Sequence, residues 1–74
     1  MAITIKRGTT EEARREFICF VHAYQCMGLN DLDAPTVTLY TQDDDALPVF
    51  EAMEHNTVTD VKTGPAAIAA IMAA

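Results

Sequence analysis

The segment Thr9–Leu29 is the longest periodic stretch of this 74-residue chain and constrains its fold more than any other. Apolar side chains recur along it at intervals of three and four residues, the spacing of a helix with one buried face. They are Ala13, Phe17, Phe20, Val21, Tyr24 and Met27. The first half of the segment is charged, and its second half has no charge at all. We therefore predict a central core helix, capped by Thr9 or Thr10 and ending near Gly28.

Three shorter segments have the alternation or the β-branched composition of strands. They are Ala2–Arg7, Thr36–Thr41 and Thr57–Lys62. In the last of them, Val58 and Asp60 are expected on one face of the sheet and Val61 on the other. Two further helices are expected over Asp45–His55 and Pro65–Ala74, because proline is tolerated in a first helical turn.

Strands and helices thus alternate as β-α-β-α-β-α, which indicates a single α+β domain over residues 1–74. Threonine alternates with apolar residues in the strands, so one face of the sheet is expected to stay open. We predict a small two-layer domain in which a three-stranded sheet carries helices mainly on one face. A three-layer α/β miniature is the alternative.

The net charge of −6 is unevenly distributed along the chain. Residues 1–29 have a balance of +1, whereas residues 30–74 have a balance of −7. An acidic half repels phosphate groups, so no direct nucleic-acid binding is expected. A basic protein surface would be attracted to it instead.

The N-terminal residues contain no apolar signal-peptide core, and no uncharged apolar run reaches the length needed to cross a bilayer. We therefore expect a cytoplasmic protein without a membrane partner. Two cysteines with reduced thiols fit that location.

Cys19, His22 and Cys26 are the most evident candidate metal ligands, because thiolate and imidazole groups at offsets of three and four share a helix face. Structural zinc requires a fourth ligand, and free cysteine is commonly buried as a small hydrophobic residue. We predict that both cysteines pack in the core and that no metal or cofactor is bound. Metal binding through this Cys-His-Cys set is kept as an alternative.

The stretch TVTLYTQDDDALPVFEAMEH followed by NTVTDVKTGPAAIAAI resembles the opening strand-helix-strand-helix of a glutaredoxin. Asp43–Ala46 stands where that family has its Cys-x-x-Cys motif, and the family's cis-proline segment has no counterpart. The resemblance therefore implies no redox activity. Serine is absent from the chain, which excludes a serine-based catalytic triad, and we predict a protein that is not an enzyme.

The sequence thus predicts a small acidic protein that binds another protein through carboxylates. An inhibitor or mimic encoded by a mobile element has this size and charge. The partner-binding residues are expected to be Asp43, Asp44, Asp45, Glu51 and Glu54. The alternative is a structural or assembly subunit that forms a homodimer through Pro65–Ala74, because an uncharged helix needs apolar cover.

Overall fold

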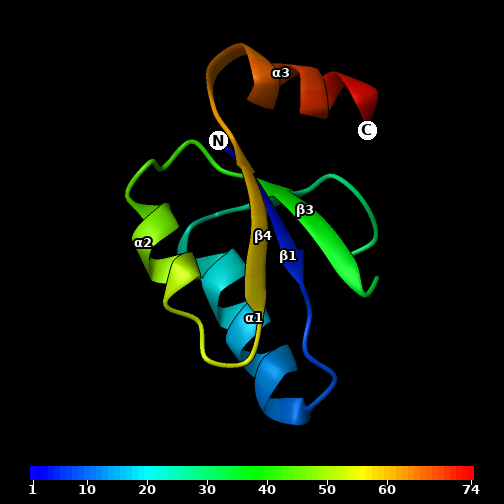
Figure 1. Ribbon diagram of the computed structural model, residues 1–74. Helices are drawn as coiled ribbons and strands as arrows, with labels where there is room; N and C mark the ends of the chain where they lie inside the picture. The colour runs from blue at the N-terminus through cyan, green and yellow to red at the C-terminus, as the bar shows by residue number, and fades with distance from the viewer.

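A four-stranded antiparallel sheet organises the chain in the computed structural model, which describes residues 1–74. The elements are β1 (Ala2–Lys6), α1 (Glu11–Ala23), β2 (Met27–Gly28), β3 (Thr36–Tyr40), α2 (Ala46–Glu51), β4 (Thr57–Lys62) and α3 (Gly64–Ala73) (Figure 1). The strand order is β2-β3-β1-β4. The α+β class is confirmed, and β2 adds a fourth strand to the three that were predicted.

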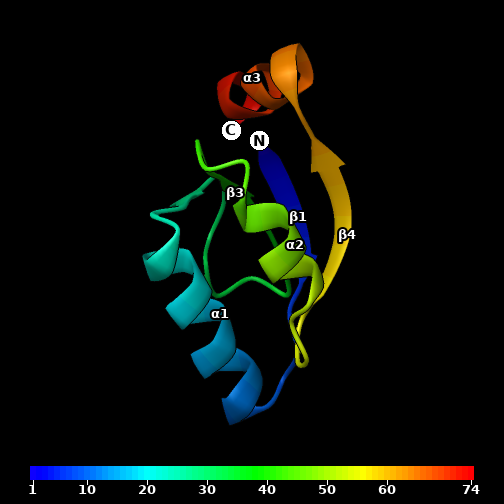
Figure 2. The same ribbon diagram turned by 90° about the vertical axis from the view of Figure 1, so that its left-hand side faces the viewer.

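The domain has two layers, with α1 and α2 on one face of the sheet (Figures 1 and 2). Helix α3 lies beyond the end of the sheet at which β4 finishes. Both β3 and β4 run antiparallel to β1, so they run parallel to each other with β1 between them. Neighbouring strands are all antiparallel, so the domain is not a doubly wound three-layer miniature.

The core lies between the sheet and the two helices. Ile3, Ile5, Val37 and Leu39 of the sheet are fully buried, and so is Phe50 of α2. The Phe50 and Phe20 rings are perpendicular to each other, with a centroid distance of 5.7 Å. Every second residue of β1 and β3 therefore faces the helices, as the alternation predicted.

Helix α1 is shorter than predicted. Thr10 caps its start by accepting a hydrogen bond from the backbone N–H of Ala13 at 3.1 Å. The helix ends at Ala23, and Gln25 adopts the left-handed conformation with φ of 50°. Residues 27 and 28 then pair with β3 as an edge strand, so the expected helix to Leu29 with Gly28 as its cap is wrong. Pairing with the free edge of β3 satisfies backbone groups that another helical turn would have satisfied locally.

The opposite face of the sheet is rich in threonine and open, as predicted. The hydroxyl groups of Thr4 and Thr38 lie 3.1 Å apart on this face. A register shift between β1 and β4 leaves Thr59 without a partner, so Val58 faces Ile5 and Val61 faces Ile3. Both valines thus pack toward the core, and their predicted placement on opposite faces is wrong.

Glu16 of α1 fastens the segment that follows α2. Its carboxylate accepts hydrogen bonds from the backbone N–H groups of Glu54 and His55 at 2.9 and 3.0 Å, and from the Asn56 amide at 2.9 Å. Burial opposes ionisation of Glu16, but these hydrogen bonds outweigh it and lower the pKa of the carboxyl group. Helix α2 ends at Glu51, earlier than the predicted His55, and the backbone of Glu54 and His55 binds Glu16 instead of continuing the helix.

Candidate protein-interaction surfaces

The five predicted partner-binding carboxylates lie on both sides of α2. Three of them, Asp43, Asp44 and Asp45, precede the helix, Glu51 is its last residue, and Glu54 follows it. All five residues are exposed. We call this set the α2 acidic surface; helix α2 itself lies on the outside of the domain, as Figure 2 shows.

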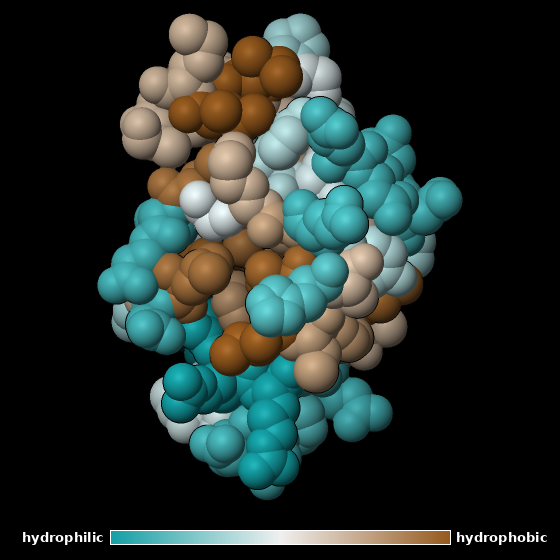
Figure 3. Space-filling view, turned by 180° about the vertical axis from the view of Figure 1, so that it is seen from behind, coloured by the Kyte–Doolittle hydropathy of each residue, from teal (hydrophilic) through white to brown (hydrophobic).

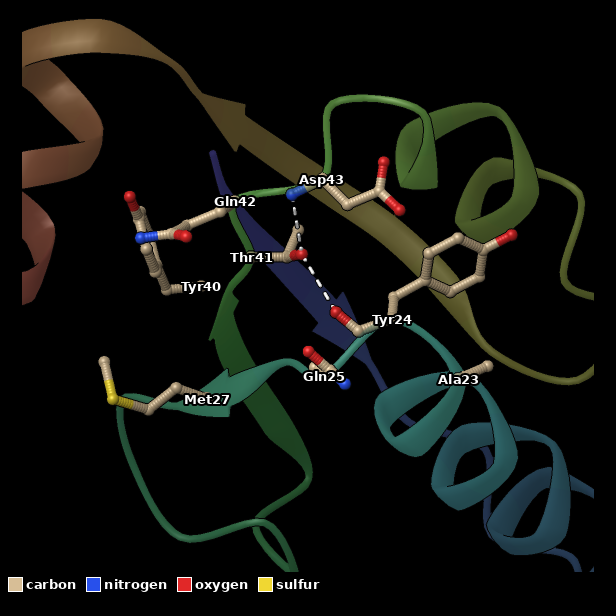
Figure 4. A pocket seen from close by; sticks show the side chains of 8 residues that line it. All are labelled: Ala23, Tyr24, Gln25, Met27, Tyr40, Thr41, Gln42 and Asp43. Carbon is tan, nitrogen blue, oxygen red and sulfur yellow. Dashed lines mark hydrogen bonds between the residues drawn. The ribbon is translucent and has the colours of Figure 1, made fainter.

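Hydrogen bonds shape the start of the α2 acidic surface. The Thr41 hydroxyl donates to the Tyr24 carbonyl at 3.1 Å and accepts the Asp43 N–H at 3.1 Å (Figure 4). The Asp43 carboxylate in turn accepts the N–H of Asp45 at 2.9 Å. Asp45 occupies the N-cap position of α2, but its side chain makes no capping hydrogen bond. The local turn is therefore held by Thr41 and Asp43, and the carboxylates of Asp44 and Asp45 stay free of it.

The α2 acidic surface has little internal charge compensation. The ion pairs of the protein join Arg15 to Glu11, Lys62 to Asp60, and His55 to Glu54 at 4.0 Å, the last only when the histidine is protonated. The other four carboxylates of the surface have no cation within ion-pair distance. Their mutual repulsion favours an incoming basic group.

A hollow lies next to Asp43, between the end of α1 and the β2–β3 pair (Figure 4). In Figure 4 the Tyr40 and Gln42 side chains are on one side of it, and the Tyr24 ring is on the other side beside α2. Tyrosine is one of the residue types enriched among the interface residues that contribute most to binding. The sequence pattern placed Tyr24 on the buried face of a helix and did not single out Tyr40 or Gln42, because the hollow forms only where the end of α1 meets the β2–β3 pair.

Helix α3 is the second candidate surface. It contains no charged residue, and only Ala67 is buried. Ile68 is 50% exposed and Met72 is 81% exposed. In the space-filling view, brown and tan side chains gather over α3 at the top of the molecule (Figure 3). An apolar helix of this kind is expected to be covered, and within one chain α3 is not.

The cysteines and His22 are not brought together as the helix spacing suggested. Cys19 is exposed on α1, so its predicted burial is wrong, whereas Cys26 lies beyond the helix and packs against the core. Burial raises the pKa of the Cys26 thiol. Both thiols are free, and no three histidine, cysteine or carboxylate groups gather closely enough to hold a metal ion.

Comparison of the chain with protein-family models, with curated proteins and with solved structures found no match. None of its helices combines the length and apolar character required to cross a bilayer. The two surfaces described above are the features of the molecule that indicate a function.

Proposed function

We propose that this protein acts by binding a partner protein with a basic surface, through the α2 acidic surface. The observation that carries the proposal is the exposure of five carboxylates around one short helix, four of them without a cationic neighbour. Complementary charge would raise the association rate and select against acidic partners. The role is that of a binding protein rather than an enzyme, acting in the cytoplasm as an inhibitor or mimic of another acidic ligand.

The proposal is tested by capture of partners from a lysate, followed by mass spectrometry. A triple variant, Asp43→Asn, Asp44→Asn and Asp45→Asn, keeps an oxygen acceptor at each position and removes three charges. The matched control, Glu12→Gln, Asp31→Asn and Asp33→Asn, removes three charges from exposed residues elsewhere. We expect the wild type and the control to retain a basic partner that the triple variant loses.

Salt dependence provides the second readout. Binding by exposed carboxylates should weaken steeply between low and physiological ionic strength, because the Debye length shortens. Equal binding of the triple variant, or binding that is insensitive to salt, would contradict the proposal.

The exposure of α3 favours a second candidate function, self-association into a homodimer as an assembly subunit. A double variant, Ile68→Ser and Met72→Ser, removes the two most exposed large side chains of the helix. Ile18→Ser with Leu32→Ser is the matched control, because both side chains are 42% exposed elsewhere. Sedimentation equilibrium should show a dimer for the wild type and the control, and a monomer for the α3 variant. A wild type that stays monomeric at high concentration would exclude self-association.

A further inference from the structure

The two edges of the sheet are protected to different degrees. On the β3 side, β2 and the Leu29 N–H cover the edge, and Asn30 continues this cover. The Asn30 amide donates to the Thr36 carbonyl at 2.9 Å, and its oxygen accepts the Thr38 N–H at 2.8 Å. On the other side, no strand lies outside β4, which forms the right-hand margin of Figure 2. An uncovered edge is a template for pairing with another strand.

We propose that a second copy of this chain pairs antiparallel with the C-terminal half of β4, about a two-fold axis beside Val61. The inference rests on the proposed self-association and adds the position of the second copy. The two sheets would then form one continuous sheet across the axis. Each copy would present the same edge, which is the usual arrangement of a closed dimer.

The charges of β4 select this register. In an antiparallel pair, residues directly opposite each other lie on the same face of the sheet, and successive residues of a strand lie on opposite faces. A two-fold axis between two copies of one strand must therefore pass beside a residue that faces its own copy, and cannot pass between two residues. An axis beside Asp60 or Lys62 places two like charges opposite each other. An axis at residues 57–59 runs the pairing through the bulge at Thr59. These registers are therefore disfavoured.

An axis beside Val61 places Asp60 of each copy opposite Lys62 of the other. Within one chain these two side chains already form an ion pair of 2.8 Å on the open face of the sheet. In the dimer, the four charges would alternate in sign around the axis, with opposite residues about 5 Å apart at Cβ. The strand is thus complementary in charge to a second copy of itself, although each chain carries a net charge of −6.

Helix α3 supplies apolar area beside the same axis. Pairing of Asp60–Lys62 alone is too short to form a stable interface, because such an interface buries about 800 Å² on each partner. Helix α3 begins at Gly64, three residues after Val61, so its first residue lies within about 11 Å of Val61. The uncovered edge and the uncovered helix are therefore adjacent, and one partner can cover both.

Charge reversal tests the register. Each chain of the Asp60→Lys variant carries lysine at both positions beside the axis, and each chain of the Lys62→Asp variant carries aspartate at both. We expect each alone to raise the dissociation constant of the homodimer about tenfold or more, because like charges become opposite neighbours. An equimolar mixture of the two variants should form a heterodimer with near wild-type affinity, and so should the homodimer of the double variant that exchanges the two residues.

Glu12→Lys is the matched control for Asp60→Lys, since it replaces an acidic residue with lysine in the same way at an exposed position of α1. Sedimentation equilibrium measures the dissociation constants, and circular dichroism verifies that each variant is folded. If the single variants dimerise like the wild type while the α3 serine variant does not, the β4 register is overturned and self-association through α3 stands. If the wild type is a monomer, both are overturned.

Discussion

Helices α1 and α3 relate to the core in different ways. Helix α1 has charged residues along one side, and buries Ala13, Phe17 and Val21 against the sheet. Helix α3 has no charge and buries only Ala67. The apolar character of a helix therefore does not decide its burial; a free apolar face must be available to receive it. In this domain α1 and α2 occupy that face, and the other face carries threonine and charged residues.

The largest difference between the two helices is expected from truncation of their large side chains. Phe17 is 1% exposed, and the guanidinium carbon of Arg7 lies 4.2 Å from the centroid of its ring. Phe17→Ala should lower the free energy of unfolding by roughly 3–5 kcal/mol through the cavity that it leaves. Met72→Ala should change it by less than about 0.5 kcal/mol, because Met72 is 81% exposed. Urea denaturation of both variants checks this contrast, which equal effects would refute.

Two glycines extend the same comparison to the backbone. A Cβ atom at Gly8 would overlap the His55 carbonyl oxygen and lie 2.8 Å from the Ala13 Cβ, so Gly8→Ala should destabilise by roughly 1–3 kcal/mol. Gly64 has φ of 57°, and a Cβ atom there would meet nothing within 4 Å. Gly64→Ala should therefore cost about 1 kcal/mol, from the backbone conformation alone. A larger effect at Gly64 in thermal unfolding would mean that the α3 junction is as tightly packed as the start of α1.

A third contrast, of about the same size as the effect at Gly64, concerns the attachment of α1 to the segment after α2. Hydrogen bonds lower the pKa of Glu16 in the folded state, so its contribution to stability is present above the ordinary glutamate pKa and is lost as the pH falls through the lowered value. Glu16→Gln should cost about 1 kcal/mol at neutral pH. The wild type should also lose more stability than this variant between neutral and acidic pH.

Glu12→Gln is the control for this measurement, because Glu12 is exposed on the same helix. Parallel urea titrations across pH should separate Glu16→Gln from both the wild type and Glu12→Gln. Identical pH dependence in the three proteins would show that the Glu16 hydrogen bonds do not contribute to stability.

Sequence periodicity predicted the strands closely, since β1, β3 and β4 differ from the predicted ranges by no more than one residue at either end. The two errors in the elements occurred where a distant segment competed with local structure. Residues beyond Ala23 pair with β3 instead of extending α1, and Glu16 binds the segment after Glu51 instead of leaving it to α2. The helical periodicity of a segment carries no information about the distant residues, here β3 and Glu16, that bind it in the folded chain.

The candidate surfaces also combine features that the sequence predicts with features that depend on distant parts of the chain. The sequence singles out the five acidic residues and all five are exposed, while their role in binding a partner stays a prediction. The lack of charge in the second half of α1 predicts that Cys19 is buried, yet Cys19 is exposed. The edge position of β4 was not predictable either, because strand order depends on which distant strands pair.

The sequence by itself determined the α+β class, the open threonine face and the acidic character of the region around α2, because these depend on composition and on short-range periodicity. Only the tertiary structure decided that β1 lies at the centre of the sheet, that β4 is an uncovered edge and that α3 lies outside the core. Those outcomes depend on competition among segments for one apolar face and for unpaired backbone groups. Contacts between residues far apart in the chain decide the outcome of that competition, and a short-range sequence pattern does not contain this information.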